Sequence, residues 1–194
     1  FKLSFPAEFH AQTAVEAAMT LHHEVADRLD DIAEIEIETQ DAGVRIIDKT
    51  GPLANPADRD HCIQYMVAVP LIFGRLTADD YEEDIAQDPR IDALREKMIV
   101  RENRQFNADY LDPDKRAIGN AITIRFEDGT STDRVAVDYP IGHQRRRAEG
   151  IPVLREKFER NLRSYYGGDQ TDTILAACSD LSGLQEMSFC NFMD

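Results

Sequence analysis

The chain has 194 residues, of which 42% are hydrophobic and 30% are charged, fractions that suit a folded domain and exclude a disordered chain. The 22 Lys and Arg residues stand against 37 Asp and Glu residues, so the formal net charge is −15, which opposes binding to nucleic acid or to an anionic membrane. No apolar run approaches the roughly 18 residues of a membrane helix, and no signal sequence opens the chain.

The cysteines Cys62, Cys178 and Cys190 are odd in number and form no CxxC pair. This pattern argues against a disulfide framework and against a zinc or iron–sulfur site with Cys ligands. We expect three free and mostly buried thiols in a reducing compartment, and therefore a cytoplasmic protein, or one of the mitochondrial matrix in a eukaryote.

Apolar residues at three- and four-residue spacing predict a helix over 9–29. The strict alternation of 32–39 predicts a strand with one face in a core and an acidic face in water. Residues 41–60 are ambiguous around Val44–Ile47 and become a loop at 51–56. A helix over 57–76 follows, and it is apolar on all sides, which indicates burial.

Short helices are predicted over 78–86, after an N-cap signature at Thr77, and over 89–98, followed by an irregular stretch over 99–117. Asp128-Gly129 predicts the turn of a hairpin, with strands over 120–126 and 132–139. Beyond a basic loop, helices are predicted over 151–162, with Leu154 and Phe158 pointing inward, and over 169–178 and 181–187. Segregated helices and strands indicate an α+β fold, with a small, mainly antiparallel sheet and helices packed on it.

Three clusters of polar residues are candidates for chemistry. Glu8 and His10 stand at the start of the first helix, where they suit an anionic substrate, or where they are merely a capping Glu and a surface His. A basic loop carries Arg145, Arg146 and Arg147, which could hold carboxylates by bidentate hydrogen bonds or pair with the acidic surface.

The third cluster is Arg59, His61 and Tyr65 at the start of the apolar helix. Tyr65 follows His61 by four residues, so both are expected on one helix face. A buried Tyr hydroxyl needs a partner, which is either a substrate carboxylate or a backbone carbonyl.

Three longer motifs resemble the second domain of the MmgE/PrpD family, in its dehydratase branch. They are Phe5-Pro6-Ala7-Glu8-Phe9-His10, then Asp58-Arg59-Asp60-His61-Cys62-Ile63-Gln64-Tyr65, and then Asp138-Tyr139-Pro140-Ile141-Gly142-His143 with the arginines after it. The similarity runs from about Lys2 to about Gly168. It implies an α+β second domain over 1–168, a helical extension of the same unit over 169–194, and a larger helical first domain that this chain lacks.

The resemblance further implies a hydro-lyase that removes water from 2-methylcitrate, giving 2-methyl-cis-aconitate in propionate catabolism, without metal, cluster or other cofactor. The site would lie between the two domains. Tyr65 matches the family Tyr and His61 starts the same motif. Lys2 stands four residues before Pro6, one more than the usual family spacing, and Glu8 stands where other members have His.

From these matches we expect Lys2 and Arg59 to bind substrate carboxylates, with Glu8, Arg145 and Arg146 as further binding residues. Tyr65 is expected to donate a proton, and His10 or His61 to orient or relay one. A tricarboxylate substrate and the missing helical domain are the expected partners, and a homodimer is left open. The start at Phe1 suggests a fragment, which alone is expected to be inactive. The alternatives are a related decarboxylase or epimerase, and a non-catalytic α+β binding or dimerisation module.

Overall fold

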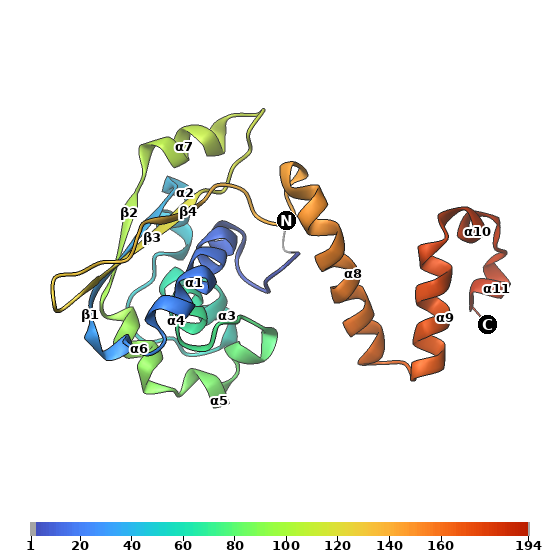
Figure 1. Cartoon of the computed structure of the whole chain (residues 1–194), viewed down its shortest axis with the longest axis horizontal. Helices are drawn as coiled ribbons and strands as arrows, with labels where there is room; N and C mark the ends of the chain where they lie inside the picture. The colour runs from blue at the N-terminus through green and yellow to red at the C-terminus, as the bar shows by residue number, and fades with distance from the viewer. Residues whose placement is uncertain (1–2, 194) are drawn as a thin grey trace. The chain divides into compact units, whose positions relative to one another are not determined.

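The computed structural model describes residues 3–193 and separates into two compact units (Figure 1). Unit 1 comprises residues 1–147 and unit 2 comprises residues 148–194. The boundary predicted at residue 168 separates the family-like domain from its helical extension, and it differs in kind from the boundary between the two compact units. It stays a prediction.

Unit 1 is built on a four-stranded mixed sheet in the order β2-β1-β3-β4. The strands are β1 (Ile32–Thr39), β2 (Met98–Glu102), β3 (Asn120–Phe126) and β4 (Val135–Val137). β1 pairs with β2 in parallel, whereas β1 with β3 and β3 with β4 are antiparallel. The predicted α+β class with a mainly antiparallel sheet is confirmed.

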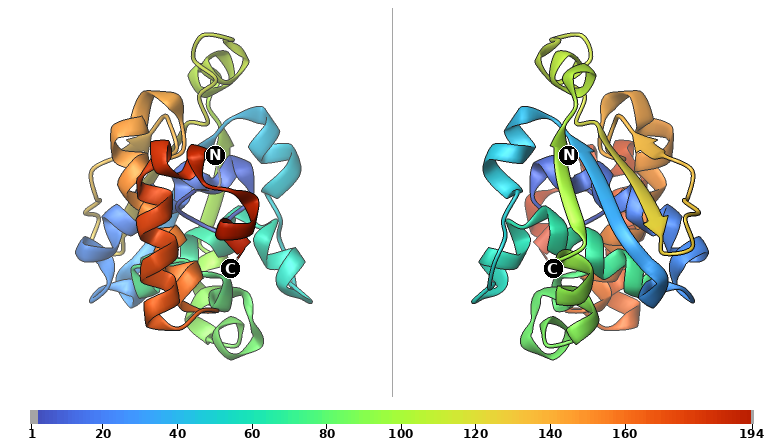
Figure 2. Two further views of the ribbon diagram at one scale, coloured as in Figure 1. Left: turned by 90° about the vertical axis from the view of Figure 1, so that its right-hand side faces the viewer. Right: turned by 90° about the vertical axis from the view of Figure 1, so that its left-hand side faces the viewer.

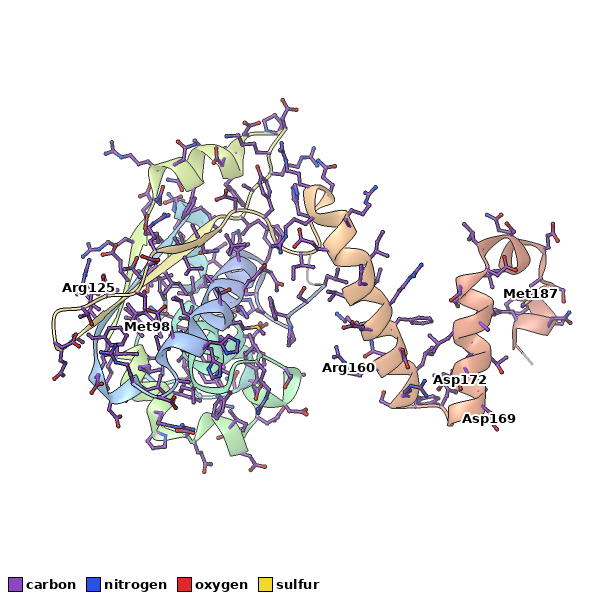
Figure 3. All side chains as sticks on the ribbon, viewed as in Figure 1. Met98, Arg125, Arg160, Asp169, Asp172 and Met187 are labelled. Atoms are coloured by element: carbon purple, nitrogen blue, oxygen red, sulfur yellow. The ribbon has the colours of Figure 1, made fainter. Side chains whose placement is uncertain are left out.

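The two faces of β1 follow its alternating sequence. Ile35 and Ile37 are fully buried in the core. The glutamates that alternate with the isoleucines are not simply solvated. They pair with arginines of β2, of β3 and of the loop between β3 and β4. These ion pairs are Glu34–Arg125, Glu36–Arg101 and Glu38–Arg134; Figure 3 labels Arg125 on the sheet. Half-exposed pairs of this kind contribute about 0–1 kcal/mol each, so they fix register more than they stabilise the fold.

The prediction of an irregular stretch over 99–117 was wrong. β2 and the helix α7 (Arg104–Leu111) lie there, and the preceding helix α6 (Pro89–Arg95) ends before Met98. Met98–Val100 is too short a run to show alternation, but its β-branched residues Ile99 and Val100 suit a strand, and the run pairs in parallel with β1. Asn103 then caps α7 by accepting hydrogen bonds from the backbone N–H groups of Gln105 and Phe106.

The hairpin of β3 and β4 is confirmed, with Gly129 in the turn at φ 84°. Its second strand covers only residues 135–137 and not 132–139. Thr132 still exchanges hydrogen bonds with Ile124, accepting from its N–H at 3.1 Å through Oγ1. Pro140, which has no backbone N–H, marks the far limit.

The predicted helix over 57–76 is interrupted. It consists of α3 (Pro56–Asp60) and α4 (Ile63–Phe73), with Cys62 in extended backbone between them. The thiol of Cys62 donates to the Lys49 carbonyl at 3.2 Å, which holds the break in place. Because His61 ends α3 and Tyr65 belongs to α4, the prediction that both share one helix face was wrong.

Helices cover one face of the sheet, with α1 packed on the strands and α4 packed on α1. α1 (Gln12–Val25), preceded by a 3₁₀ turn at Phe9–Ala11, lies against β3 and β4, and α4 lies against α1. In the right-hand view of Figure 2 the strands lie in front, with these two helices behind them. The core unites alanines of α1 with the apolar residues of α4 and the inward isoleucines of β1 and β3. The remaining helices of unit 1 are α2 (Asp41–Ile47), α5 (Glu83–Ala86) after a 3₁₀ helix at Ala78–Tyr81, and a 3₁₀ helix at Gln144–Arg146.

Among the described residues of unit 2, the regular elements are all helices. Its helices are α8 (Arg147–Arg163), which begins one residue before the boundary, α9 (Gly168–Ser179), α10 (Leu181–Glu186) and α11 (Phe189–Met193). Arg163 reaches Asp172 at 3.2 Å where α8 meets α9, and Figure 3 labels Asp172 there. No helix within residues 3–193 is long and apolar enough to cross a membrane.

Two predictions about unit 2 were wrong for the same reason. Leu154 and Phe158 do not point inward but are 53% and 38% exposed. Cys178 and Cys190 are exposed, so only Cys62 is a buried thiol. The helices of unit 2 leave much of their apolar surface uncovered by one another.

Candidate functional site

Glu8 and His10 form a buried pair where the chain enters α1. The Glu8 carboxylate caps the Phe9–Ala11 turn by accepting from the His10 backbone N–H at 2.7 Å, and its other oxygen lies 3.0 Å from His10 Nδ1. The two side chains are only 11% and 9% exposed, respectively. The capping Glu predicted from the sequence is therefore present, but its histidine is not on the surface.

The backbone of His10 is fixed as firmly as its ring. The Asn120 amide donates to the His10 carbonyl at 2.8 Å and to Thr13 Oγ1 at 2.7 Å, and Thr13 in turn donates to the Ile118 carbonyl at 2.5 Å. Both side chains that carry these bonds, Asn120 and Thr13, are fully buried. The bonds tie the start of α1 to the start of β3, so His10 has little freedom to move.

Glu8 is an ionised partner for the imidazole. Burial by itself raises the pKa of the Glu8 carboxyl, but the hydrogen bonds and the charge of His10 outweigh burial and bring this pKa below its usual value. An ionised Glu8 accepts hydrogen bonds and places a proton on His10 Nδ1. The pair thus orients the imidazole so that Nε2 faces away from Glu8.

Tyr110 of α7 occupies the other side of the imidazole. Its hydroxyl lies 3.3 Å from His10 Nε2, and the two rings are tilted with centroids 5.7 Å apart. Sequence reasoning missed this residue because it treated 99–117 as irregular. The Asn103 N-cap signal, read with Phe106 and Tyr110 four residues apart, could have found the helix that carries it.

Arg59 and Tyr65 come together at a different place, around residues 80–83. Arg59 is 4% exposed and donates to the Tyr81 carbonyl and to the Glu83 carboxylate, each at 2.6 Å. Tyr65 is 2% exposed and its hydroxyl donates to the Asp80 carbonyl at 2.6 Å. Both hydrogen-bond donors are thus occupied by the protein itself.

Burial also raises the pKa of Tyr65, to about 12, even though the charge of Arg59 acts in the opposite direction. A phenol of this kind stays protonated at neutral pH and keeps its bond to the Asp80 carbonyl. The N-cap predicted at Thr77 is confirmed and forms a capping box with Asp80, which accepts from the Thr77 N–H at 2.7 Å and from its hydroxyl at 2.8 Å. The geometry around Tyr65 is that of a well-ordered structural anchor.

His61 is not brought to either cluster. His61 is half exposed at the end of α3, with Nδ1 3.7 Å from the Asp60 carboxylate. Lys2 lies outside the described residues.

The predicted arginines lie on the segment after β4. Arg146 makes a bidentate ion pair with Glu16 of α1, at 2.8 and 2.7 Å, and donates to the Tyr139 carbonyl at 2.8 Å. Arg145 lies over the Tyr139 ring and donates to the Asp114 carbonyl at 3.1 Å. Arg145 is exposed, so of the two it is the more available to a substrate.

His143 belongs to the same segment and to the family motif, but no role is predicted for it from the sequence. It is 2% exposed, and its Nδ1 accepts from the Arg145 N–H at 3.1 Å. Burial, helped by the charge of Arg145, lowers the pKa of His143, against the opposing effect of the Lys115 backbone.

A surface cavity of about 400 Å³ lies between the loop at 49–52 and α6, with Gln64, Arg95 and Met98 in its wall. None of the predicted site residues lines it. In the described range no group of three or more His, Cys, Asp or Glu residues is arranged to hold a metal ion.

Comparison with known proteins gives close relatives for the whole chain. It is 58% identical over 197 residues to 2-methylcitrate dehydratase of Salmonella typhimurium, covering 100% of this chain and 41% of that protein. It is 63% identical over 180 residues to the mitochondrial 2-methylcitrate dehydratase of Yarrowia lipolytica, covering 91% and 35%, respectively. A probable 2-methylcitrate dehydratase of Saccharomyces cerevisiae is 52% identical over 199 residues, covering 100% and 38%.

The chain therefore spans about two fifths of the length of these curated relatives. A family model described as the MmgE/PrpD C-terminal domain matches residues 5–181, which takes in all of the sheet, the Glu8–His10 pair and most of unit 2. The chain belongs to the MmgE/PrpD family, and its match is to the C-terminal domain.

Proposed function

We propose that this chain is part of a hydro-lyase that dehydrates 2-methylcitrate to 2-methyl-cis-aconitate in propionate catabolism, with citrate as a further substrate. The observation that carries the proposal is an identity of 52–63% to relatives with that name, over 91–100% of the chain. Because the chain spans only part of those relatives, the activity is assigned to the full-length protein that contains it.

The site geometry supports an elimination. Loss of water needs a group that accepts the carbon-bound proton, a group that protonates the departing hydroxyl, and cations for the carboxylates. The Glu8–His10 pair offers an oriented imidazole in a nearly dry environment. The arginines after β4 bring positive charge into a strongly acidic chain.

The predicted residues differ in how well they suit these roles. His10 and Glu8 are the favoured pair for relaying a proton, and exposed Arg145 is the favoured carboxylate ligand. Arg146 binds a second carboxylate once the substrate replaces Glu16 as its ion-pair partner. For Arg59 and Tyr65, whose donors bind residues 80–83, we favour a supporting role. Lys2 and His61 remain proposals on family resemblance alone.

We infer that the partner of this chain is a helical domain that precedes it in the full-length protein. Unit 2 exposes a series of large apolar side chains that a soluble chain would normally bury. They are Ile151, Leu154, Phe158, Leu181, Met187, Phe189 and Phe192, with exposures from 37% to 77%. A domain interface on this surface explains them. We further propose a cytoplasmic location, or the mitochondrial matrix in a eukaryote, where one relative is named as mitochondrial.

Turnover by the full-length protein tests the function. We expect it to convert 2-methylcitrate, with absorbance of the unsaturated product as the readout, and the 194-residue chain alone to be inactive. Parallel assays on citrate, on cis-aconitate for decarboxylation and on iminodisuccinate for epimerisation cover the related reactions. Preference for either of the last two, or no turnover by the full-length protein, would contradict the proposal, and the latter would favour a binding module.

A further inference from the structure

Tyr110 extends the Glu8–His10 pair into a chain of three groups. The Glu8 carboxylate lies 3.0 Å from Nδ1 of the imidazole, and the phenol oxygen lies 3.3 Å from Nε2. Both ring nitrogens of His10 are therefore occupied by protein groups. The imidazole itself is only 9% exposed, whereas Tyr110 is half-buried. Of these three groups, the phenol is the one that reaches the surface.

The helix that carries Tyr110 is held in place from several sides. Phe106, four residues earlier on the same face, is buried against Gly119, where an added Cβ would come within 2.5 Å of the ring. Asn107 accepts from the Asp41 backbone N–H at 2.5 Å, and the Asp109 carbonyl accepts from the Ala117 N–H at 3.2 Å. The position of the phenol is thus set by the fold and not by a mobile loop.

Gly119 also connects α7 to the Glu8–His10 end of the three hydrogen-bonded groups. It directly precedes Asn120, whose amide holds the His10 carbonyl at 2.8 Å. The same short stretch of backbone therefore positions both Tyr110, through Phe106, and His10. Such mutual support is what a proton-transfer pair requires, because the donor and acceptor must keep their distance within a few tenths of an ångström.

We propose that the hydroxyl of Tyr110 is the group that touches the substrate and donates a proton to its departing hydroxyl, while Glu8 and His10 act behind it as positioning residues. The phenol O–H is a hydrogen-bond donor that can face the substrate, so it serves as the acid. This inference rests on the proposed dehydratase function.

The proton balance of the step is complete. The carbon–oxygen bond breaks with its electron pair on oxygen, the Tyr110 proton joins that oxygen, and water leaves. The electron pair of the carbon–hydrogen bond forms the double bond as a separate general base of the enzyme accepts that proton. The phenolate then takes a proton from Nε2 of His10, and the proton that the general base removed from carbon returns to His10 through solvent.

The test is Tyr110→Phe in the full-length protein, with Tyr81→Phe as matched control. Tyr81 is a buried tyrosine whose hydroxyl finds no hydrogen-bond partner among the described residues. For Tyr110→Phe we expect kcat to fall about 10²-fold or more, with KM within about threefold and Tm nearly unchanged. Tyr81→Phe should leave kcat unchanged.

A double variant separates the proton chain from a simple packing role. Because groups that act as one unit are strongly non-additive, Tyr110→Phe combined with His10→Gln should be hardly slower than His10→Gln alone. Additive losses, or a Tyr110→Phe enzyme with normal kcat and a lowered Tm, would overturn the inference while the dehydratase function stands. A wild-type protein without dehydratase activity would overturn both.

Discussion

At the scale of single residues, two neighbouring tyrosines show how burial and hydrogen bonding decide what a hydroxyl contributes. Tyr65 and Tyr81 stack with ring centroids 5.8 Å apart. Tyr65 donates to the Asp80 carbonyl at 2.6 Å, whereas the Tyr81 hydroxyl is buried with no partner in the part of the chain that the structure describes. Burial raises the pKa of both phenols.

This difference predicts opposite outcomes for the same chemical change. Tyr65→Phe should lower the free energy of unfolding by about 0.5–1.5 kcal/mol, because the Asp80 carbonyl loses its donor. Tyr81→Phe should be neutral or stabilising, because it removes a hydroxyl that pays a desolvation cost without a bond. Chemical denaturation of the two variants measures this directly.

The same Tyr65→Phe variant tests the role predicted for Tyr65 from the sequence. In the full-length protein, a structural anchor predicts a kcat/KM close to that of wild type. A fall of about 10²-fold with unchanged stability would instead establish Tyr65 as a proton donor and would refute our preference for a supporting role.

A buried histidine makes stability depend on pH. The folded pKa of His143 is lowered, chiefly by burial and then by the charge of Arg145, so the unfolded chain binds its proton more readily. Stability from this residue is therefore present above the unfolded value of about 6.5 and is lost as the pH falls below it.

We expect His143→Asn to flatten the dependence of unfolding free energy on pH between about 7 and 5. Asn retains an acceptor for the Arg145 N–H, whose bond to Nδ1 is 3.1 Å long. His23→Asn, on an exposed face of α1, serves as control. An unchanged slope for His143→Asn would mean that other groups dominate acid unfolding.

At the scale of elements, the sequence pattern predicts those helices and strands whose signals lie within a few residues of one another. The alternation of Ile35 and Ile37 with glutamates predicts β1 with its correct limits, and Asp128-Gly129 predicts the hairpin turn. β2 escapes prediction because its pairing with β1 is parallel and comes from residues more than 60 positions away. No short-range pattern reports such a contact.

The candidate site follows the same division. Glu8 and His10 are two residues apart, so their pairing is visible in the sequence. Tyr110 is 100 residues from His10 and Asn120 is 110 residues from it, and only the fold brings them together. The break between α3 and α4 is likewise set by distant partners, since Arg59 and Cys62 bond to residues 81–83 and 49.

At the scale of the whole molecule, the two units differ in how they bury apolar surface. Every fully buried residue of the hydrophobic core lies between Ala7 and Phe126, within unit 1. Unit 2, by contrast, is composed of helices whose apolar side chains remain largely exposed. The helices of unit 2 therefore bury little apolar surface against one another. For their stability they depend on packing against a surface outside unit 2.

The consequence can be measured by placing one substitution in two contexts. Leu154 is 53% exposed in this chain, so Leu154→Gln should change the stability of the isolated chain by no more than about 0.5 kcal/mol. In the full-length protein a preceding helical domain would cover the same side chain. There, Leu154→Gln should cost about 2 kcal/mol or more, because a buried apolar group is replaced by an amide without a partner.

Ile46 on α2 is the matched control, because it is 52% exposed but belongs to unit 1. Ile46→Gln should have a small effect in both contexts. The readout is the shift in denaturation midpoint of each variant relative to its own parent, which cancels the difference in size between the two proteins. Equal small shifts for Leu154→Gln in both contexts would show that unit 2 keeps this face in water, and the proposed domain interface would have to lie elsewhere.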